Sequence, residues 1–207
     1  ISSCYNNMGN VFEEQQNYEK AQDYYTRALD LNRKLGETRN IGTCLNNLGE
    51  IHLKQNQIRQ ARTYFHQSLE YRQKTNDKRG ISAVYSNLAM MNLKTRNYSQ
   101  SLDQLHKELK LDNEIGDKKG MAEDMISLAR VYLEQGRLNQ ATSFARQGRQ
   151  ISDTIQAPLQ KKSALEVLAQ VYEKRGDYRR ALQYNRAFEE IEDRLFNQQK
   201  NQQIEEL

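Results

Sequence analysis

What this sequence lacks narrows the classes of protein to which it can belong. Its 207 residues include one proline, no tryptophan and two cysteines. No apolar run approaches the roughly 18 residues that a membrane-spanning helix requires, so we predict no membrane span in this segment. An excess of one charge is missing too, because 31 basic and 27 acidic residues leave a net charge of +4 without a long basic block. The mixed charge argues against nucleic acid as a partner.

Signals for catalysis are also missing. The sequence has no glycine-rich phosphate loop and no His-Glu-x-x-His pair. Of its histidines, His66 lies one helical turn from Glu70, an arrangement that can hold a metal ion but is weak alone. We therefore predict that the chain is not an enzyme and binds neither a cofactor nor a metal. Because the chain begins at Ile1 rather than at methionine, we expect a fragment, and targeting segments can lie outside it.

The apolar content is low for a single compact core. Only 37% of the residues are hydrophobic, and the mean hydropathy is −0.98. A repeat array resolves this difficulty, because each repeat buries its apolar face only on its neighbours. The sequence does repeat, with a period of 40 residues. Five units align without a gap over residues 1–40, 41–80, 81–120, 121–160 and 161–200.

Two columns of this alignment contain small residues, and a short polar break separates them. The first column holds Gly9, Gly49, Ala89, Ala129 and Ala169, and the second holds Ala21, Ala61, Ser101, Ala141 and Ala181. Apolar residues recur at helical spacing on both sides of the break, which predicts two helices joined by a turn in each unit. Small residues in both columns let the paired helices approach closely without overpacking.

The ends of the units carry signals for helix termination. Gly36, Asn76 and Gly116 suit a helix C-cap, and an acidic residue follows each of them. Pro158, the single proline, is predicted to stand at the start of a helix.

The two cysteines, Cys4 and Cys44, share one column of the alignment. Equivalent residues of neighbouring repeats lie two helix steps apart, at about 8–10 Å for each step. That separation exceeds the limit of about 7 Å between the Cα atoms of a disulfide. We expect both cysteines to be reduced thiols.

These columns resemble the tetratricopeptide repeat. The resemblance rests on the Leu-Gly or Leu-Ala pair, on an aromatic residue three positions later such as Phe12 or Tyr172, and on the spacing from Ala21 to Tyr25. The 40-residue unit is similar to the long-helix variant of kinesin light chains, Pins-type polarity adaptors and many bacterial signalling proteins. The resemblance implies an all-α fold, a right-handed α-solenoid of five tetratricopeptide-type helix-turn-helix repeats with a C-terminal helix. Residues 1–200 are then a single array.

Asparagine recurs on the first helix of the early units, although it is a poor helix former. Asn7, Asn47 and Asn87 occupy one column, and their amides match the C=O and N–H groups of an extended peptide. By resemblance, such a ladder on the concave inner face holds a peptide or protein segment. The alternative is a row of solvated polar residues on an exposed face. We predict a peptide-binding surface that includes Asn6, Asn7, Asn10, Asn46, Asn47, Glu50, Ser86, Asn87, Met90, Ser127, Arg130 and Gln170.

The tail admits two interpretations. Phe188, Ile191, Leu195, Ile204 and Leu207 recur at rough helical spacing, which suits a capping helix or the start of a coiled coil. Residues 201–207 are predicted to extend the last helix toward a missing effector domain. The tail resembles the exit helix of bacterial tetratricopeptide sensor proteins, and this resemblance favours a sensor module, with a lean toward the periplasm. One alternative is a structural oligomerisation scaffold that acts through the end repeats and the C-terminal helix, for example as a homodimer. The other alternative is a small-molecule sensor.

Overall fold

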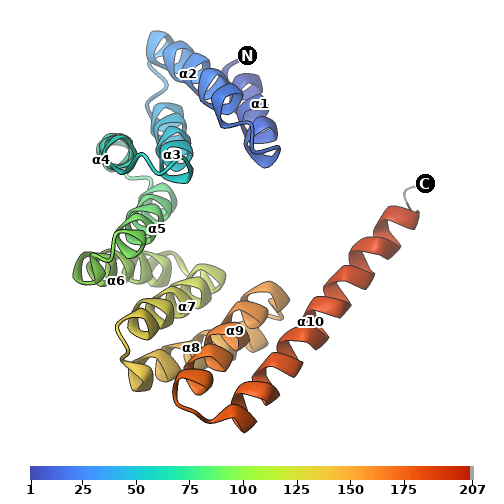
Figure 1. The fold of residues 1–207 in the computed structure, drawn as a ribbon. Helices are drawn as coiled ribbons and strands as arrows, with labels where there is room; N and C mark the ends of the chain where they lie inside the picture. The colour runs from blue at the N-terminus through green and yellow to red at the C-terminus, as the bar shows by residue number, and fades with distance from the viewer. Residues whose placement is uncertain (206–207) are drawn as a thin grey trace. The chain divides into compact units, whose positions relative to one another are not determined.

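The computed structural model describes residues 1–205, with side chains described through residue 201. Within this part the chain forms ten helices and no strand (Figure 1). The first helices of the five units are α1 (Ser2–Glu14), α3 (Thr38–Lys54), α5 (Lys78–Lys94), α7 (Lys118–Glu134) and α9 (Pro158–Lys174). The second helices are α2 (Tyr18–Leu35), α4 (Ile58–Lys74), α6 (Tyr98–Ile115), α8 (Leu138–Thr154) and α10 (Tyr178–Glu205). The predicted all-α series of helix pairs is confirmed.

Every turn between helices contains a residue with a left-handed backbone. The predicted C-caps Gly36 and Gly116 have φ of 71° and 72°, and Asn76 has φ of 49°. Pro158 is the first residue of α9, as predicted. Asp77 and Asp117 cap the next helices, since each carboxylate accepts a hydrogen bond from the backbone N–H three residues later. The turns therefore follow from local chemistry that the sequence displays.

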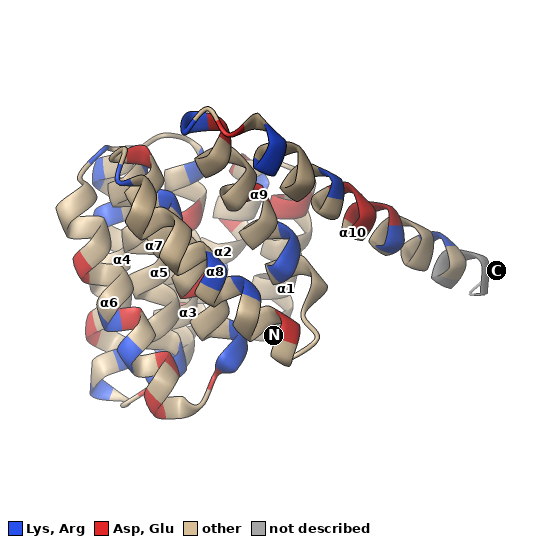
Figure 2. Cartoon of the chain, turned by 90° about the horizontal axis from the view of Figure 1, so that it is seen from below, with Lys and Arg blue, Asp and Glu red and all other residues tan. Residues whose placement is uncertain are grey.

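The chain packs as two compact units. The first comprises Ile1–Leu111 and the second begins at Asp112, so the boundary falls inside α6. The apolar core of the first unit is centred on Tyr25, Leu45, Leu48, Phe65, Val84 and Met91. The core of the second unit is centred on Ile126, Leu133, Val167, Leu168 and Tyr172. Basic and acidic residues are interspersed along the helices of both units (Figure 2).

The size of each small residue on a first helix is matched to the size of the side chain that it faces on the second helix. A Cβ added to Gly9 would lie 2.4 Å from the Tyr25 ring, and one added to Gly49 would lie 2.5 Å from the Phe65 ring. In the columns equivalent to Phe65, the third and fourth repeats carry Leu105 and Ala145. The residues at the glycine position in those repeats are alanines. Ring size and backbone approach therefore compensate within each repeat, as close packing requires.

A stacked aromatic pair joins the two helices in four of the five repeats. The ring centroids are 5.1–5.5 Å apart in Phe12–Tyr24, His52–Tyr64, Tyr132–Phe144 and Tyr172–Tyr184. His52 is thus a buried core residue, and its Nδ1 lies at hydrogen-bond distance from Gln57. The third repeat has Asn92 and Gln104 at these positions instead.

Both cysteines are free thiols, as predicted. Cys4 is exposed, whereas Cys44 is buried and receives a hydrogen bond from Asn32 Nδ2 at 3.5 Å. Burial raises the pKa of the Cys44 thiol.

The last helix is the longest, with 28 residues in α10, and it runs well past the end of α9 (Figure 1). Of the predicted extension, Glu206 and Leu207 lie outside the described residues. Among the described residues, no helix has the length and apolar character required to span a bilayer.

Candidate functional site

The asparagines of the first unit form a hydrogen-bonded row across α1, α3 and α5. Asn47 Nδ2 donates to Asn6 Oδ1 at 3.0 Å, and Asn87 Nδ2 donates to Asn46 Oδ1 at 3.0 Å. Each bond joins residues 41 positions apart, so each rung connects one repeat to the next. Together with Glu50, these bonds bring together five of the predicted site residues, namely Asn6, Asn46, Asn47, Glu50 and Asn87.

Glu50 is the centre of the row. Its Oε1 accepts from Asn46 Nδ2 at 2.5 Å and from Asn87 Nδ2 at 2.7 Å. Burial raises the pKa of the Glu50 carboxyl, the Asn87 hydrogen bond opposes this, and the nearby Glu13 charge adds to it. The half-buried carboxylate is therefore held in one orientation by two amides.

Some hydrogen-bond donors and acceptors of the asparagine side chains make no bond within the described part of the chain. A side-chain amide has two N–H donors and one oxygen acceptor with two lone pairs. Asn87 uses its amide nitrogen twice, toward Asn46 and Glu50, so its oxygen is the group that remains. Asn47 uses its nitrogen once and keeps one donor and its oxygen. Asn7 is exposed, with no side-chain hydrogen bond within the described part of the chain.

A second polar group supports the row from α1 and α2. Tyr25 is fully buried, and its hydroxyl group donates to Glu13 Oε2 at 2.5 Å and lies 2.8 Å from Asn10 Oδ1. Burial and the bond to Glu13 raise the pKa of Tyr25 well above its usual range. Lys54 Nζ contacts the other Glu13 oxygen at 2.6 Å. The single proton of this hydroxyl goes to Glu13, so Asn10 lies beside the group without a donated hydrogen bond from Tyr25.

The other predicted site residues lie elsewhere on the first helices. Asn46 is buried, with 6% of its surface exposed, so it orients Glu50 and Asn87 rather than facing solvent. Ser86 is partly exposed and Met90 is 57% exposed, both on α5. In the second unit, Ser127 and Arg130 of α7 line a small cleft of about 240 Å³.

In that cleft Arg130 pairs with Glu166 at 3.0 Å, and Gln160 Nε2 donates to Glu123 at 2.7 Å. Gln170 is exposed on α9. Ser127, Arg130 and Gln170, the predicted site residues of the second unit, therefore do not form a bonded amide row with the described residues.

Sequence reasoning missed a column of lysines near the ends of the first helices. Lys94 Nζ donates to the Leu53 carbonyl at 3.2 Å, and Lys174 Nζ donates to the Leu133 carbonyl at 3.4 Å. In both cases the lysine reaches the last turn of the first helix one repeat earlier, where carbonyls lack helical partners. The recurrence of lysine at positions 54, 94 and 174 was the available signal.

A larger cavity lies within the second unit, between α8, α9 and α10. Its volume is about 730 Å³, and Leu165 and Ile191 contribute to its apolar lining. Two ion pairs lie among its lining residues, Lys161–Asp153 at 2.6 Å and Arg194–Glu190 at 3.9 Å. The Nε atom of Arg149, which also lines the cavity, is buried without a hydrogen-bond partner among the described residues. The amide row links three helices through hydrogen bonds, so we take it as the candidate site.

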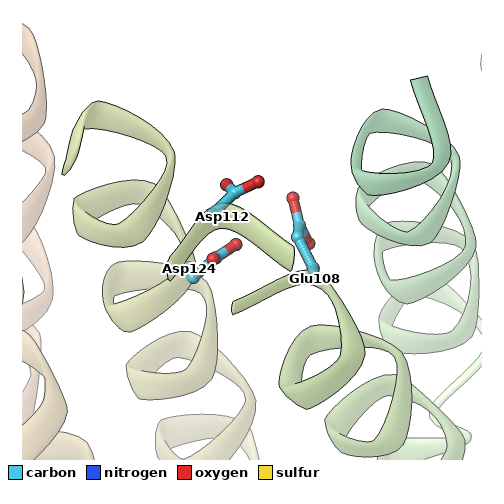
Figure 3. A group of neighbouring side chains, drawn as sticks. All are labelled: Glu108, Asp112 and Asp124. Carbon is cyan, nitrogen blue, oxygen red and sulfur yellow. The ribbon is translucent and has the colours of Figure 1, made fainter. Parts of the chain in front are cut away.

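Three buried acidic side chains gather at another place. Glu108 and Asp112 of α6 and Asp124 of α7 each bring a carboxylate oxygen within 4.8 Å of the others (Figure 3). All three have interactions with other groups of the protein. An acidic cluster alone does not define a metal site, so we assign none to it. The sequence signal was two acids one turn apart, at columns that hold small residues in the fourth repeat.

The paired helices, the 40-residue spacing and the matched small columns define a class of helical repeat protein. A family model of the tetratricopeptide repeat matches residues 1–74 and 80–154, and a second model of this repeat matches residues 164–186. The chain therefore belongs to the tetratricopeptide repeat family, an all-α solenoid fold that typically serves as a non-catalytic interaction scaffold. No curated protein matches the sequence.

Several solved structures share this fold. A signal transduction ATPase with a tetratricopeptide repeat sensor from Pyrococcus horikoshii has a TM-score of 0.84 and 16% identity, covering 96% of this chain and 30% of that one. A Rap protein complexed with Competence and Sporulation Factor has a TM-score of 0.80 and 17% identity, covering 90% of this chain and 52% of that one. Kinesin light chain repeats of Podosopora anserina give 0.75 and 13%, covering 94% and 96%. At these identities the likeness shows the fold alone.

Proposed function

We propose that this chain is an interaction module that binds an extended peptide or protein segment along α1, α3 and α5. The observation that carries the proposal is the hydrogen-bonded row of amides, which links the three helices and fixes the directions of Asn6, Asn46, Asn47 and Asn87. A ligand that meets groups already held in place loses less free energy on ordering them. The row is thus preorganised for a polar, extended partner.

The unused donors and acceptors of the row, together with those of the neighbouring Asn7, suit a peptide backbone. Asn7 and Asn47 each keep a donor and an acceptor, which pair with the C=O and N–H of one peptide unit. Asn87 keeps its oxygen, which accepts one backbone N–H. Asn46 lies beneath the contact surface and holds the row in register. Asn6, Asn10, Ser86 and Met90 flank these contacts and set selectivity for ligand side chains.

The structural relatives support a sensing role within a larger protein. One of them is described as having a tetratricopeptide repeat sensor, and another was solved with a bound factor. This chain spans 30% of the first and 52% of the second. We propose that it is the ligand-binding part of a signalling protein and that α10 passes the bound state to the next module.

The test is a binding screen against a random peptide library. The parent chain is compared with the triple variant Asn7→Ala, Asn47→Ala, Asn87→Ala. A matched control replaces three exposed asparagines outside the row, as Asn40→Ala, Asn113→Ala, Asn185→Ala. We expect the parent and the control to retain peptides and the row variant to lose them, while circular dichroism shows that all three are folded. Equal retention by the row variant contradicts the role of the ladder.

Self-association through α10 is a different function, favoured by the exposure of Phe196, of which 64% is accessible. It predicts a mass that rises with concentration in sedimentation equilibrium and a monomer after Phe196→Ser. A constant monomer mass of the parent rejects it.

A further inference from the structure

The atoms that the row leaves open around Glu50 are acceptors. Oε1 of Glu50 accepts the hydrogen bonds from Asn46 and Asn87, and Oε2 accepts none from the described residues while keeping access to solvent. Beside it, Asn87 has used both of its amide protons, so only its oxygen can meet a ligand. Resting on the function proposed above, we propose that the ligand places a cationic group, an ammonium or a guanidinium, against Glu50 and Asn87.

The charges nearby are consistent with an acceptor site. On α1, Glu13 brings a second carboxylate, which is held by the Tyr25 hydroxyl of α2 and by Lys54 of α3. Lys54 is the one cation among these groups, and its ammonium contacts Glu13 at 2.6 Å and not Glu50. Glu50 is therefore left without an ion-pair partner in the described part of the chain.

The two amides that hold Glu50 make the carboxylate a fixed point rather than a mobile one. Asn46 and Asn87 donate to the same oxygen, which directs the second oxygen away from them. An ionised group that is partly desolvated gains more from a charged partner than one in bulk water. Burial, which raises the pKa of this carboxyl, adds to the benefit of a bound cation.

Glu50→Gln is the sharpest variant for a test. Its side-chain oxygen still accepts from Asn46 and Asn87, so the row is kept. Its amide nitrogen replaces Oε2, which turns the open acceptor into a donor. Glu70→Gln is the matched control, because it removes the same charge from an exposed position of α4.

The probe is a positional-scanning library of blocked nonapeptides with Arg, Lys, norleucine or Glu fixed at each position in turn. We expect the parent and Glu70→Gln to prefer Arg or Lys at one position at least tenfold over norleucine. Glu50→Gln should lose this preference. The best arginine peptide is then compared with its citrulline analogue, which has the same shape without charge. That measurement uses the parent chain alone, so it holds even if a variant folds poorly.

The outcomes separate this inference from the proposed function. Equal affinity for arginine and citrulline peptides, with binding retained by Glu50→Gln, overturns the cationic anchor and leaves peptide binding in place. An arginine preference that survives in Glu50→Gln also overturns it, because another group must then be responsible. Failure of the parent to bind any peptide overturns both proposals.

Discussion

The repeat column that holds the hydrogen-bonded amides of Asn47 and Asn87 in the first unit holds an apolar side chain, Val167, in the second unit. Asn47 and Asn87 donate across to the preceding repeat at 3.0 Å. In the same column, Val167 of α9 has 0% of its surface exposed and lies in the apolar core with Ile126. A buried side-chain amide is stable only where the group that it faces can form a hydrogen bond with it. The contrast shows that one column of the repeat can hold either hydrogen-bonded amides or part of the apolar core.

The largest effect is expected from placing an amide in the second unit. Val167→Asn buries a polar group among apolar residues with no partner from the row, so it should lower the free energy of unfolding by about 1–3 kcal/mol. Val167→Leu adds similar bulk without polarity and serves as the control. Urea denaturation followed by circular dichroism measures the difference. Equal stability of the two variants would show that an amide is tolerated there.

A somewhat smaller loss of stability is expected from replacing a small residue of a first helix by a larger one. Gly49→Ala brings a Cβ against the Phe65 ring, and overpacking of this kind costs about 1–3 kcal/mol, less about 1 kcal/mol gained in helix propensity. Adding Phe65→Leu recreates the Ala89 and Leu105 combination of the third repeat. The double variant should therefore be more stable than the sum of the single changes. Additive effects in a double-mutant cycle contradict this compensation.

The smallest effect is a change of peptide affinity with pH. It is expected from the carboxylate in the bonded row and has no counterpart in the apolar core. Binding of an arginine peptide requires ionised Glu50, and its pKa is raised above the ordinary value by burial, with Glu13 raising and Lys54 lowering it. Affinity should fall as pH decreases, beginning above the usual glutamate value of about 4.3 and by less than tenfold per pH unit. Fluorescence anisotropy of a labelled peptide measures it. Binding by Glu50→Gln should be weak and independent of pH, and a parallel decline in both would implicate another group.

The fold could be predicted because its signals are local and repeated. Gly36 and Asn76 end helices through their own backbone preferences, and the small residues recur at fixed offsets. The hydrogen-bond partners of the candidate site residues could not be predicted in the same way. Asn46 was assigned to the open face but is buried, because its place depends on a neighbour one repeat away. The pairing of Lys54 with Glu13 depends on rotamers in two helices, which periodicity does not specify.

Within a repeat, glycine on the first helix faces an aromatic ring of the second helix, whereas alanine faces a smaller side chain. This matching has a consequence for how such arrays evolve. A genetic crossover inside a repeat would join the first helix of one copy to the second helix of another. A first helix with Ala129 would then face Phe65, and the Cβ would meet the ring. A crossover between repeats keeps every matched pair together. Duplication and exchange are thus expected to proceed by whole repeats, with the turn before each first helix as the natural breakpoint.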